Sequence, residues 1–563
     1  MKYLKIGIYE LSAVAIIVFA SFLRILLASQ GWPISNSDEG TMGIMALHIA
    51  YHGEHPLFFY GQNYMGSLEA YLGAVLFHFF GASLFTLRLG VILLVALFLV
   101  SMYLLTSLLF SKQLALVTLA LLSLGSNVIL TRQIMATGGS AETLLFSSLA
   151  FLLASWLSLI YSQDPSRKSR WRYLGYGGFG LVVGLGLWSD MIILPFVAMA
   201  ALLLLLFCWR DLWSWAPLCL VLGLMIGTFP LIDYNYRRLH TRGSDSLFVL
   251  LKLFQGSTSQ SPHTLSGLIH AVKGTILVSL PTATGNPFCP VSEEWQYFPY
   301  SSPHTTGCTM IHASWGLGYL VLWAIALVLT LRTLWQLRQH AQASPEPAER
   351  SAVIRQFARL ILLGSAALAL TAYAFSSGPV SWPGIHARYL MGLLIVTPAV
   401  ISPLWSGIST MKPPLSRLAK VKAVSSGGML LLIGILLLIG TVKTFSEMPS
   451  AQVISRQQDM LIHHLLRIGV RHVYTDYWTC DSMAFESEEQ IICVVVDDNL
   501  HPSHNRYMPY IAKVSADRYA AYVFPLGYPQ AMTITKKAAR PGAAYQRFVF
   551  DGYVVYKPLG KSP

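Results

Sequence analysis

Charged residues are scarce in this chain of 563 residues: only 12% are Asp, Glu, Lys or Arg, whereas 54% are hydrophobic. A soluble domain normally carries about 25% charged residues. Such a deficit is expected where long segments face lipid, because a charge at membrane depth is costly. The composition therefore excludes an ordinary soluble protein and predicts a chain with many segments in a bilayer.

The sequence also lacks the motifs of soluble nucleotide- and metal-dependent enzymes. No Walker loop, dinucleotide-binding glycine pattern or zinc-type Cys/His spacing stands near an expected strand–helix boundary. The net charge of +13 comes from short clusters of Lys and Arg between apolar runs, with no extended basic face. We therefore interpret the charge as a signal of membrane topology and expect no nucleic-acid partner.

Long apolar runs are abundant, and a membrane-spanning helix needs about 20 mostly apolar residues. The first run lacks a clear small-x-small cleavage site, so we expect an uncleaved anchor. The pattern predicts a polytopic α-helical membrane protein with about eleven transmembrane helices, at residues 8–28, 84–110, 113–130, 141–161, 174–188, 191–208, 213–232, 313–332, 358–376, 389–406 and 427–442.

The distribution of Lys and Arg predicts the orientation of these helices. With the N-terminus in the cytoplasm, the inner connections hold seventeen Lys and Arg, and the short outer connections hold two, Arg132 and Arg388. Cytoplasmic connections carry such an excess in membrane proteins. We therefore expect an integral plasma-membrane protein in which the segments 29–83 and 233–312, and all residues after about 443, lie outside.

The composition of the sequence changes after Lys443, where charged residues become frequent. Residues 451–468 have helical spacing, and strand-like runs follow at 471–477, 490–496 and 549–556. We predict two domains: a membrane module at 1–442, and a small extracytoplasmic α/β domain at 443–563 with no recognisable catalytic motif of its own.

Only six cysteines are present, and four of them lie in segments predicted to be outside. Cys289 and Cys308 bracket part of the 233–312 loop, while Cys480 and Cys493 lie in the tail. An oxidising compartment would permit two disulfides within these segments. Four unpaired thiols are the alternative, because connectivity cannot be read from sequence.

Acidic residues are few in the membrane half, so the pair Asp38–Glu39 directly after the first span is notable. Adjacent carboxylates in a Ser/Asn/Gly context also occur on ordinary surface loops. The loop continues through Tyr60–Tyr71, an apolar and aromatic stretch with glycines and no cation. Such a stretch favours helices at the membrane interface or over a cavity, rather than a solvated loop.

Several short motifs along residues 8–405 resemble those of one membrane family. They are Asp38-Glu39, Gly66-Ser67-Leu68-Glu69-Ala70-Tyr71, Phe80-Gly81, Leu87-Arg88-Leu89, Arg132, Ala141-Glu142-Thr143-Leu144 and Ala387-Arg388-Tyr389-Leu390. In order and spacing the chain resembles the GT-C superfamily of glycosyltransferases, which includes protein O-mannosyltransferases and the aminoarabinose transferase of lipid A. The loop 233–312 and the tail do not align with either type.

The resemblance implies inverting transfer of a sugar from a polyprenyl-phosphate-linked donor to an acceptor on the outer face. An attacking hydroxyl needs a carboxylate base, for which Asp38 is the first candidate and Glu39 the rival. The departing phosphate needs cations, hydrogen bonds or a metal, so a divalent cation is a candidate cofactor. Which sugar and which glycan, lipid or protein acceptor are used is left open.

The other site residues also follow from the resemblance. Glu142 would be a second catalytic acid, although a carboxylate at a helix N-terminus can also serve the helix alone. Glu69 would bind substrate. The rare outer cations Arg132, His386 and Arg388 would bind the donor phosphate; their alternative is snorkelling at the interface.

Two other classes of protein share parts of this plan. A polymerase, ligase or flippase of lipid-linked glycans would have many spans and large outer loops, with more cations in the loop 233–312. A secondary transporter would favour inverted repeats and broken helices in matching halves, which the sequence does not display. A large outer α/β tail is also unusual for a transporter.

Overall fold

The computed structural model describes residues 7–163, 170–239, 264–289, 303–341, 347–409, 417–542, 544–550 and 552–559. Contacts divide the chain into two compact units. The helical unit comprises residues 1–23, 93–133 and 139–444, and the α/β unit comprises residues 24–92, 134–138 and 445–563. The segment that carries Asp38 therefore belongs to the same unit as the C-terminal residues.

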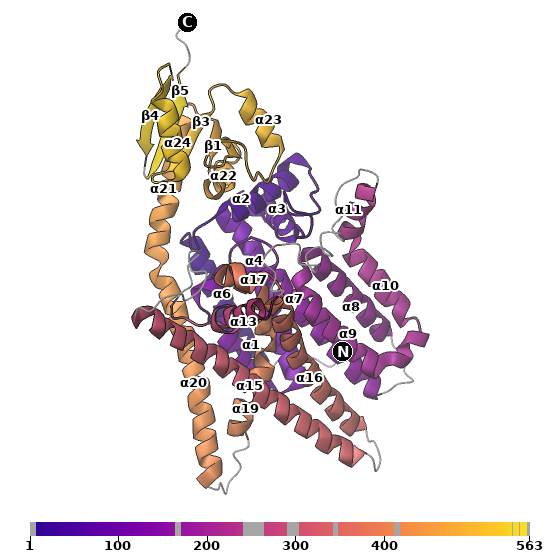
Figure 1. Ribbon diagram of the computed structural model, residues 1–563. Helices are drawn as coiled ribbons and strands as arrows, with labels where there is room; N and C mark the ends of the chain where they lie inside the picture. Colours follow the sequence, from indigo (N-terminus) through magenta and orange to yellow (C-terminus); the bar gives the residue numbers. More distant parts are fainter. Residues whose placement is uncertain are drawn as a thin grey trace. The chain divides into compact units, whose positions relative to one another are not determined.

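The helical unit is built from α-helices (Figure 1) with short 3₁₀ and π segments, which are named η in the text. Helices α1 and α4 begin or end in the α/β unit. The elements are α1 (Ile8–Ser29), α4 (Leu84–Leu109), α5 (Lys112–Ser123), α6 (Asn127–Arg132), α7 (Ser140–Gln163), α8 (Arg170–Ser189), η2 (Met191–Ile193), α9 (Leu194–Cys208), η3 (Trp209–Trp213), α10 (Ala216–Gly227), α11 (Phe229–Leu239), α13 (Leu265–Gly274), η4 (Thr275–Ser279), α14 (Leu280–Thr284), α15 (Pro303–Ala341), α16 (Pro347–Ala374), α17 (Gly378–Ser381), α18 (Pro383–His386), η5 (Ala387–Val396), α19 (Thr397–Ser409) and α20 (Arg417–Ser446).

Within the described ranges, nine helical runs are long and apolar enough to cross a membrane, or ten if the bent pair α10 and α11 forms one span. The protein is thus a multi-pass integral membrane protein, as composition predicted, with a count slightly below the expected eleven. The expected span 113–130 is interrupted, because the helix stops at Ser123 and resumes at Asn127. Its first part, α5, has 12 residues, or about 18 Å of helix against about 30 Å of hydrocarbon.

Residues 265–284 form an apolar helical run that was not among the predicted spans. They were expected in the outer loop 233–312, but they form one of the helical runs that are long and apolar enough to cross a membrane. The run contains the π segment η4 and Pro281 near its end. If this run crossed the membrane, every later segment would lie on the side opposite to the predicted one. The predicted orientation therefore requires the run to enter and leave the membrane on the same side.

Helix α8 covers the expected span 174–188, but it is not among the nine runs that are long and apolar enough to cross a membrane. Its glycines serve close packing instead: a Cβ on Gly180 would lie 2.1 Å from the carbonyl oxygen of Leu220 in α10. Small residues allow such backbone approach between membrane helices. The glycines of α8, which allow close packing on α10, are therefore the main sequence signal for this helix, in place of hydropathy.

The α/β unit joins three elements near the N-terminus to a C-terminal sheet domain (Figure 1). Its elements are α2 (Ser37–Leu47), η1 (His48–His52), α3 (Leu68–Phe80), α21 (Met448–Arg467), β1 (His472–Thr475), α22 (Tyr477–Glu486), β2 (Ile492–Val495), α23 (Pro509–Ala516), β3 (Ala521–Pro525), α24 (Pro529–Ala538), β4 (Tyr545–Phe550) and β5 (Tyr553–Pro558). The five-stranded sheet has the order β2-β1-β3-β5-β4. The strands β2, β1 and β3 are parallel; β5 pairs antiparallel with β3, and β4 pairs antiparallel with β5.

The parallel strands place two segments of the sheet domain at the same edge of the sheet. Strand β1 is followed at once by α22, and β2 is followed by the segment 496–508. Because the carboxyl ends of parallel strands meet at one edge of a sheet, both segments start from the same edge, where ligands commonly bind in such sheets.

Two glycines of α2 allow it to pack directly on α22. A Cβ at Gly40 would lie 2.3 Å from the backbone of Asp481, and one at Gly43 would lie 2.5 Å from the ring of Phe485. Any larger residue at Gly40 would push the two backbones apart. This close packing fixes the first turn of α2, where Asp38 lies, against the sheet domain.

Both expected cysteine pairs are disulfides in the structure, Cys289–Cys308 and Cys480–Cys493, each with a Cα–Cα distance of 5.6 Å. This confirms the pairing hypothesis. The second disulfide joins α22 to β2.

Replacing both Cys480 and Cys493 by Ser should destabilise the α/β unit by roughly 3 kcal/mol, the value for closing a loop of this size in the chain-entropy model. The measurement is thermal unfolding of the purified protein with and without reductant. We expect reductant to lower the midpoint of the wild type and to leave this transition of the double variant unchanged. Equal midpoints for both proteins without reductant would contradict the bond.

Candidate functional site

Asp38 lies in the first turn of α2. Asn36 caps this helix, and its side chain accepts a hydrogen bond from the backbone N–H of Glu39 at 3.0 Å. Acidic residues in a first helical turn interact favourably with the helix dipole. The local Ser/Asn pattern, which could have indicated an ordinary loop, therefore starts a helix that presents two carboxylates.

Two side chains of the sheet domain hold Asp38 by one oxygen. The hydroxyl of Tyr477 donates to Oδ1 at 2.6 Å, and Nη2 of Arg506 donates to the same atom at 2.8 Å. Among the described residues, none donates a hydrogen bond to Oδ2. The Asp38 side chain is 23% exposed, so the carboxylate is oriented and one oxygen stays accessible.

The protonation states of these partners suit that arrangement. Burial and the negative charge of Asp38 raise the pKa of Tyr477, so its phenol keeps the proton that it donates. Burial alone would lower the pKa of Arg506, but contact with Tyr477 and Asp38 raises it overall. The guanidinium also lies over the ring of Phe59, 5.0 Å from its centroid, and the Cδ atom and backbone of Arg506 pack against Gly61. Phe59 and Gly61, at the start of the aromatic, glycine-containing segment, therefore pack against Arg506 beside Asp38.

Glu39 occupies a different environment from its neighbour. Its side chain is fully buried, and Arg88 binds both of its oxygens, Nε to Oε1 at 2.9 Å and Nη2 to Oε2 at 2.7 Å. The backbone N–H of Ala136 also donates to Oε1, at 3.1 Å. With both oxygens occupied and no exposure, Glu39 is poorly placed to accept a proton from a substrate.

Glu69 is also buried, at 2% exposure, in the first turn of α3. It accepts a hydrogen bond from the backbone N–H of Gly138 at 2.8 Å. Glu39 and Glu69 thus each bind one backbone N–H of the segment 134–138, which connects α6 to α7. This position favours a structural role for Glu69 over its predicted contact with substrate.

The remaining predicted site residues belong to the helical unit. Glu142 is buried in the first turn of α7, and Arg132 ends α6. Nδ1 of His386 lies 3.2 Å from the carbonyl oxygen of Gly378, and Nη2 of Arg388 donates to the hydroxyl of Tyr389 at 3.2 Å. Helix α7 contacts η5, where Arg388 lies. Convergence of these residues with Asp38 on one cavity stays a prediction.

A second acid, Asp481, lies close to α2 but was not found from sequence. It is 4% exposed, and the hydroxyl of Thr41 donates to its Oδ2 at 2.7 Å. Burial raises the pKa of Asp481 to about 6, although the hydrogen bond from Thr41 and the charge of Arg506 act against this rise. The charged form of Asp481 therefore opposes folding at neutral pH.

Replacement of Asp481 by Asn should raise the stability of the protein at pH 7.5 and leave it unchanged at pH 4. The folded pKa lies about two units above the ordinary value of 3.8, which is worth about 3 kcal/mol. Because the folded pKa is raised, the stability from this group is complete below pH 4 and is lost as pH rises through 6. Unfolding temperatures measured at both pH values check this; an equal gain at pH 4 and 7.5 would contradict it.

Sequence reasoning missed the partners of Asp38. Tyr477 and Arg506 follow Asp38 by more than 430 residues, and no motif in the tail marks them. Arg88 did have a signal, because Leu87-Arg88-Leu89 was among the family-like motifs. Two groups of potential metal ligands occur in the part of the chain that the structure describes: His48, His52 and Glu489, and a group around Asp481 whose cysteines form the Cys480–Cys493 disulfide.

Comparison with known proteins gives matches in structure alone. No protein-family model matches the chain, and no curated protein matches it in sequence. The crystal structure of ArnT from Cupriavidus metallidurans bound to undecaprenyl phosphate is similar over 98% of this chain and 99% of that one, with 13% identity and a TM-score of 0.54. Its apo form gives 12% identity and a TM-score of 0.50, over 97% and 98% of the two chains. The oligosaccharyltransferase of Archaeoglobus fulgidus in the apo form matches over 100% of this chain and 76% of that one, with 13% identity and a TM-score of 0.48.

The membrane helices and the C-terminal sheet define a polytopic membrane protein with a small α/β domain. Its fold is the GT-C fold, which the ArnT structures share with this chain along nearly the whole length of both. This confirms the fold that the short motifs led us to expect.

Proposed function

We propose that this protein is a GT-C glycosyltransferase that moves a sugar from a polyprenyl-phosphate carrier to an acceptor hydroxyl, with inversion at the anomeric carbon. The acceptor oxygen attacks that carbon while the bond from the carbon to the phosphate oxygen breaks. The acceptor proton passes to Asp38, and the carrier leaves as polyprenyl phosphate. The fold shared with ArnT, whose structure was solved with undecaprenyl phosphate, supports the choice of donor.

The single observation that carries the proposal is the asymmetric environment of Asp38. Arg506 and Tyr477 fix Oδ1, and no described residue donates to Oδ2. A general base needs one fixed orientation and one oxygen within reach of the proton. Glu39 has neither a vacant oxygen nor exposure, so Asp38 is the better base, and Glu39 and Arg88 act by positioning α2 and the segment 134–138.

An apolar cavity in the helical unit supports a lipid substrate. It has a volume of about 600 Å³ and is lined mainly by leucine, isoleucine and aromatic side chains, among them Leu121, Trp315, Leu393 and Leu437. Such a lining suits a hydrocarbon chain, because burial of apolar surface stabilises the complex without polar groups to satisfy. A water-soluble sugar nucleotide would gain nothing from this cavity.

The donor phosphate requires positive charge. In the proposal Arg388, Arg132 and His386 bind it, and Glu142 shapes the same site as a second acid. Arg388→Ala should therefore weaken donor binding as well as turnover. A change in turnover alone would remove Arg388 from the phosphate site.

The test of the proposed function is incubation of the purified protein in detergent with two panels of donors. One panel contains polyprenyl-phosphate sugars and the other contains sugar nucleotides, each with a mixture of lipid and glycan acceptors. We expect release of free polyprenyl phosphate from at least one lipid-linked donor and no consumption of any nucleotide. Consumption of a nucleotide sugar without release of the carrier would overturn the proposal.

We also propose that the N-terminus is cytoplasmic and that the C-terminal domain is extracytoplasmic, because of the seventeen-to-two distribution of Lys and Arg. Alkaline phosphatase fused after Pro563 should be active in cells, and a green fluorescent protein at the same position should be dark. A fusion after Arg338, in an expected inner connection, should behave in the opposite way. A fluorescent, phosphatase-inactive C-terminus would reverse the orientation.

A further inference from the structure

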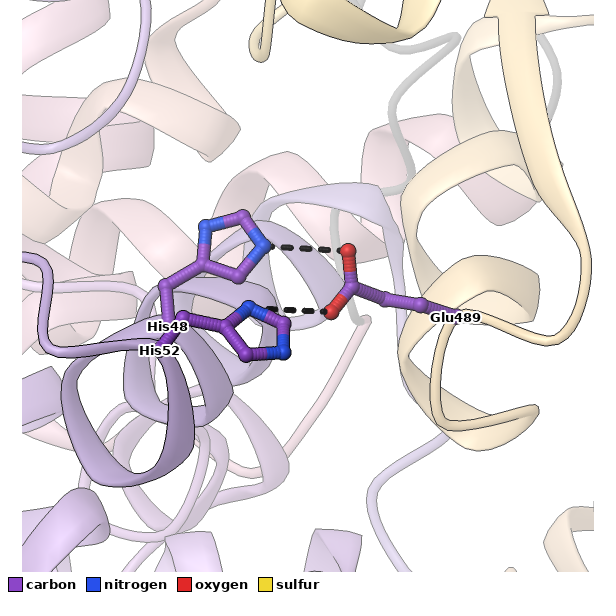
Figure 2. A group of neighbouring side chains, drawn as sticks. All are labelled: His48, His52 and Glu489. Carbon is purple, nitrogen blue, oxygen red and sulfur yellow. Dashed lines mark hydrogen bonds and ion pairs between the residues drawn. The ribbon is translucent and has the colours of Figure 1, made fainter. Parts of the chain in front are cut away.

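Two histidines and a glutamate converge within the α/β unit (Figure 2). One ligand atom from each of His48, His52 and Glu489 lies within 4.8 Å of the others. Nε2 of His48 is 3.0 Å from Oε1 of Glu489, and Nδ1 of His52 is 3.9 Å from Oε2. His48 is 2% exposed and His52 is 55% exposed, so one side of the cluster is buried and the other side is exposed to solvent.

The backbone of η1 aligns the two imidazoles. Residues His48–His52 form a π-helical turn, which ends at Gly53 in the left-handed conformation. In a π-helix, residues four positions apart lie on nearly the same side, and such turns occur frequently at functional sites. The two ring centroids are 5.2 Å apart with an interplanar angle of 33°.

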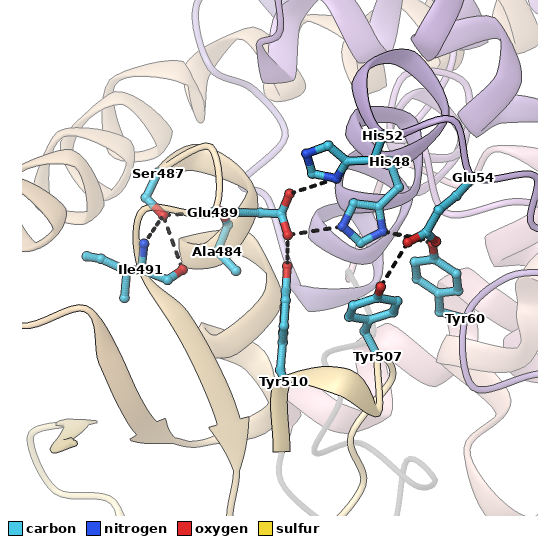
Figure 3. Close-up of polar contacts among 10 residues, drawn as sticks. All are labelled: His48, His52, Glu54, Tyr60, Ala484, Ser487, Glu489, Ile491, Tyr507 and Tyr510. Carbon is cyan, nitrogen blue, oxygen red and sulfur yellow. Dashed lines mark hydrogen bonds and ion pairs between the residues drawn. The ribbon is translucent and has the colours of Figure 1, made fainter. Parts of the chain in front are cut away.

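The glutamate is held by a strained turn. Glu488 and Glu489 both have positive φ, 48° and 59°, a conformation that costs non-glycine residues of order 1–3 kcal/mol each. The backbone N–H of Glu489 donates to the carbonyl of Ala484 at 2.8 Å, and the hydroxyl of Ser487 accepts from the N–H of Ile491 at 3.1 Å (Figure 3). These bonds keep the turn in place and direct the Glu489 carboxylate toward the histidines.

The hydrogen bonds around His48 require a positive group between it and Glu489 (Figure 3). The hydroxyl of Tyr60 donates to Oε2 of Glu54 at 2.7 Å, so its contact with Nδ1 of His48 at 2.9 Å needs a proton on Nδ1. If the ring carries only this proton, the lone pair of Nε2 points toward Oε1 of Glu489. This oxygen also accepts a hydrogen bond from the hydroxyl of Tyr510 at 2.6 Å. Two lone pairs at that distance repel, so either a second proton or a metal ion must lie between them.

The geometry points to a divalent transition-metal site formed by Nε2 of His48, Nδ1 of His52 and the carboxylate of Glu489, with Zn²⁺ as its preferred ion. Two imidazoles and one carboxylate suit Zn²⁺, whereas Mg²⁺ and Ca²⁺ prefer oxygen ligands alone. With bonds of about 2.0–2.1 Å, two ligands of a tetrahedral Zn²⁺ lie about 3.3 Å apart, close to the His48–Glu489 distance. The exposed ring of His52 can close the remaining gap, and the fourth position faces solvent.

The surroundings provide the support that metal-bound histidines need. A ligating imidazole generally donates its other N–H to an acceptor that fixes the ring. Nδ1 of His48 does this toward Tyr60 and lies 3.5 Å from Oε2 of Glu54. Tyr507 holds the other oxygen of Glu54 at 3.0 Å. The metal would thus join η1, which directly follows α2, to the turn between α22 and β2.

The experiment measures metal bound by the purified full-length protein in detergent, so it does not depend on transfer activity or on the proposed function. After treatment with a chelator, the protein is titrated with Zn²⁺, Mn²⁺ and Mg²⁺ in competition with a chromophoric chelator. We expect one Zn²⁺ per chain, weaker Mn²⁺ and no Mg²⁺. His52→Ala and Glu489→Gln should each weaken Zn²⁺ binding by about 100-fold or more, and Glu54→Gln by about 10- to 100-fold.

Glu488→Gln is the matched control, because it changes the neighbouring glutamate in the same strained turn and removes no ligand. It should bind Zn²⁺ like the wild type. Unfolding temperatures in chelator show that each variant is folded, and added Zn²⁺ should raise the midpoint of the wild type and of Glu488→Gln by more than the midpoints of His52→Ala and Glu489→Gln. Absence of stoichiometric Zn²⁺ in the wild type, or wild-type affinity in both His52→Ala and Glu489→Gln, would overturn the site and leave a His48–Glu489 ion pair.

Discussion

Asp38→Asn should lower the turnover of sugar transfer by about 10²- to 10⁴-fold, the usual worth of a general base. This corresponds to about 3–5 kcal/mol of barrier. The amide oxygen of Asn can still accept from Tyr477 and Arg506, so the side chain should keep its orientation. It cannot take the proton of the acceptor, because the amide is not basic. Donor affinity should change little, since the phosphate is assigned to cations elsewhere.

Asp517→Asn is the matched control for this substitution. Asp517 is in the same unit, is 28% exposed and is held by Nδ1 of His472 at 2.6 Å, so it resembles Asp38 in exposure and in having a close partner. We expect full transfer activity from this variant. Activity of Asp38→Asn within about threefold of wild type, with a confirmed donor, would remove Asp38 from the role of base.

Arg88→Met should destabilise the protein by roughly 3–5 kcal/mol, because it leaves Glu39 as an unpaired charge in a fully buried position. Glu39→Gln should also destabilise, since two donors of Arg88 then face a neutral amide. The loss should appear as a lower unfolding temperature of the purified protein in detergent. Replacement of both residues by Leu should recover part of the lost stability, because no unpaired charge remains. The recovery should be incomplete, because the N–H of Ala136 and the carbonyl of Pro33 lose their hydrogen-bond partners.

The exposed pair Lys112–Glu10 provides a control of the same chemistry. Its side chains are 54% and 32% exposed, and exposed ion pairs contribute little to stability. Lys112→Met should therefore leave the unfolding temperature nearly unchanged. If Arg88→Met behaves in the same way as Lys112→Met, the buried pair does not position α2 as described.

The sequence predicted those parts of the fold that depend on local composition. Apolar length identified most membrane helices, and β-branched runs identified β1 and β2. The run 549–556 was expected to be one strand, but it spans the end of β4 and the start of β5, with a turn at Gly552, whose φ is 89°. The Asp551-Gly552 pair is itself a hairpin signal. Strand β3 was missed, because Ala521–Pro525 is short and carries few β-branched residues.

The candidate site was predictable only in part, for a physical reason. A carboxylate pair after a first span is visible in sequence, so Asp38 and Glu39 could be singled out. What separates them is burial and partners: Arg88 neutralises Glu39, while Arg506 and Tyr477 reach Asp38 from a domain more than 430 residues away. Such pairing depends on the packing of α2 on α22, which no local pattern reports.

The anomeric configuration of the product tests most directly the claim that a carboxylate base drives transfer from a polyprenyl-phosphate donor. The purified protein is given a donor of known configuration, and the product is analysed by NMR together with the released polyprenyl phosphate. We expect complete inversion, with one carrier released for each sugar transferred and no sugar bound covalently to the protein. Retention of configuration would contradict the claim, because it requires a nucleophile on the enzyme in place of the base.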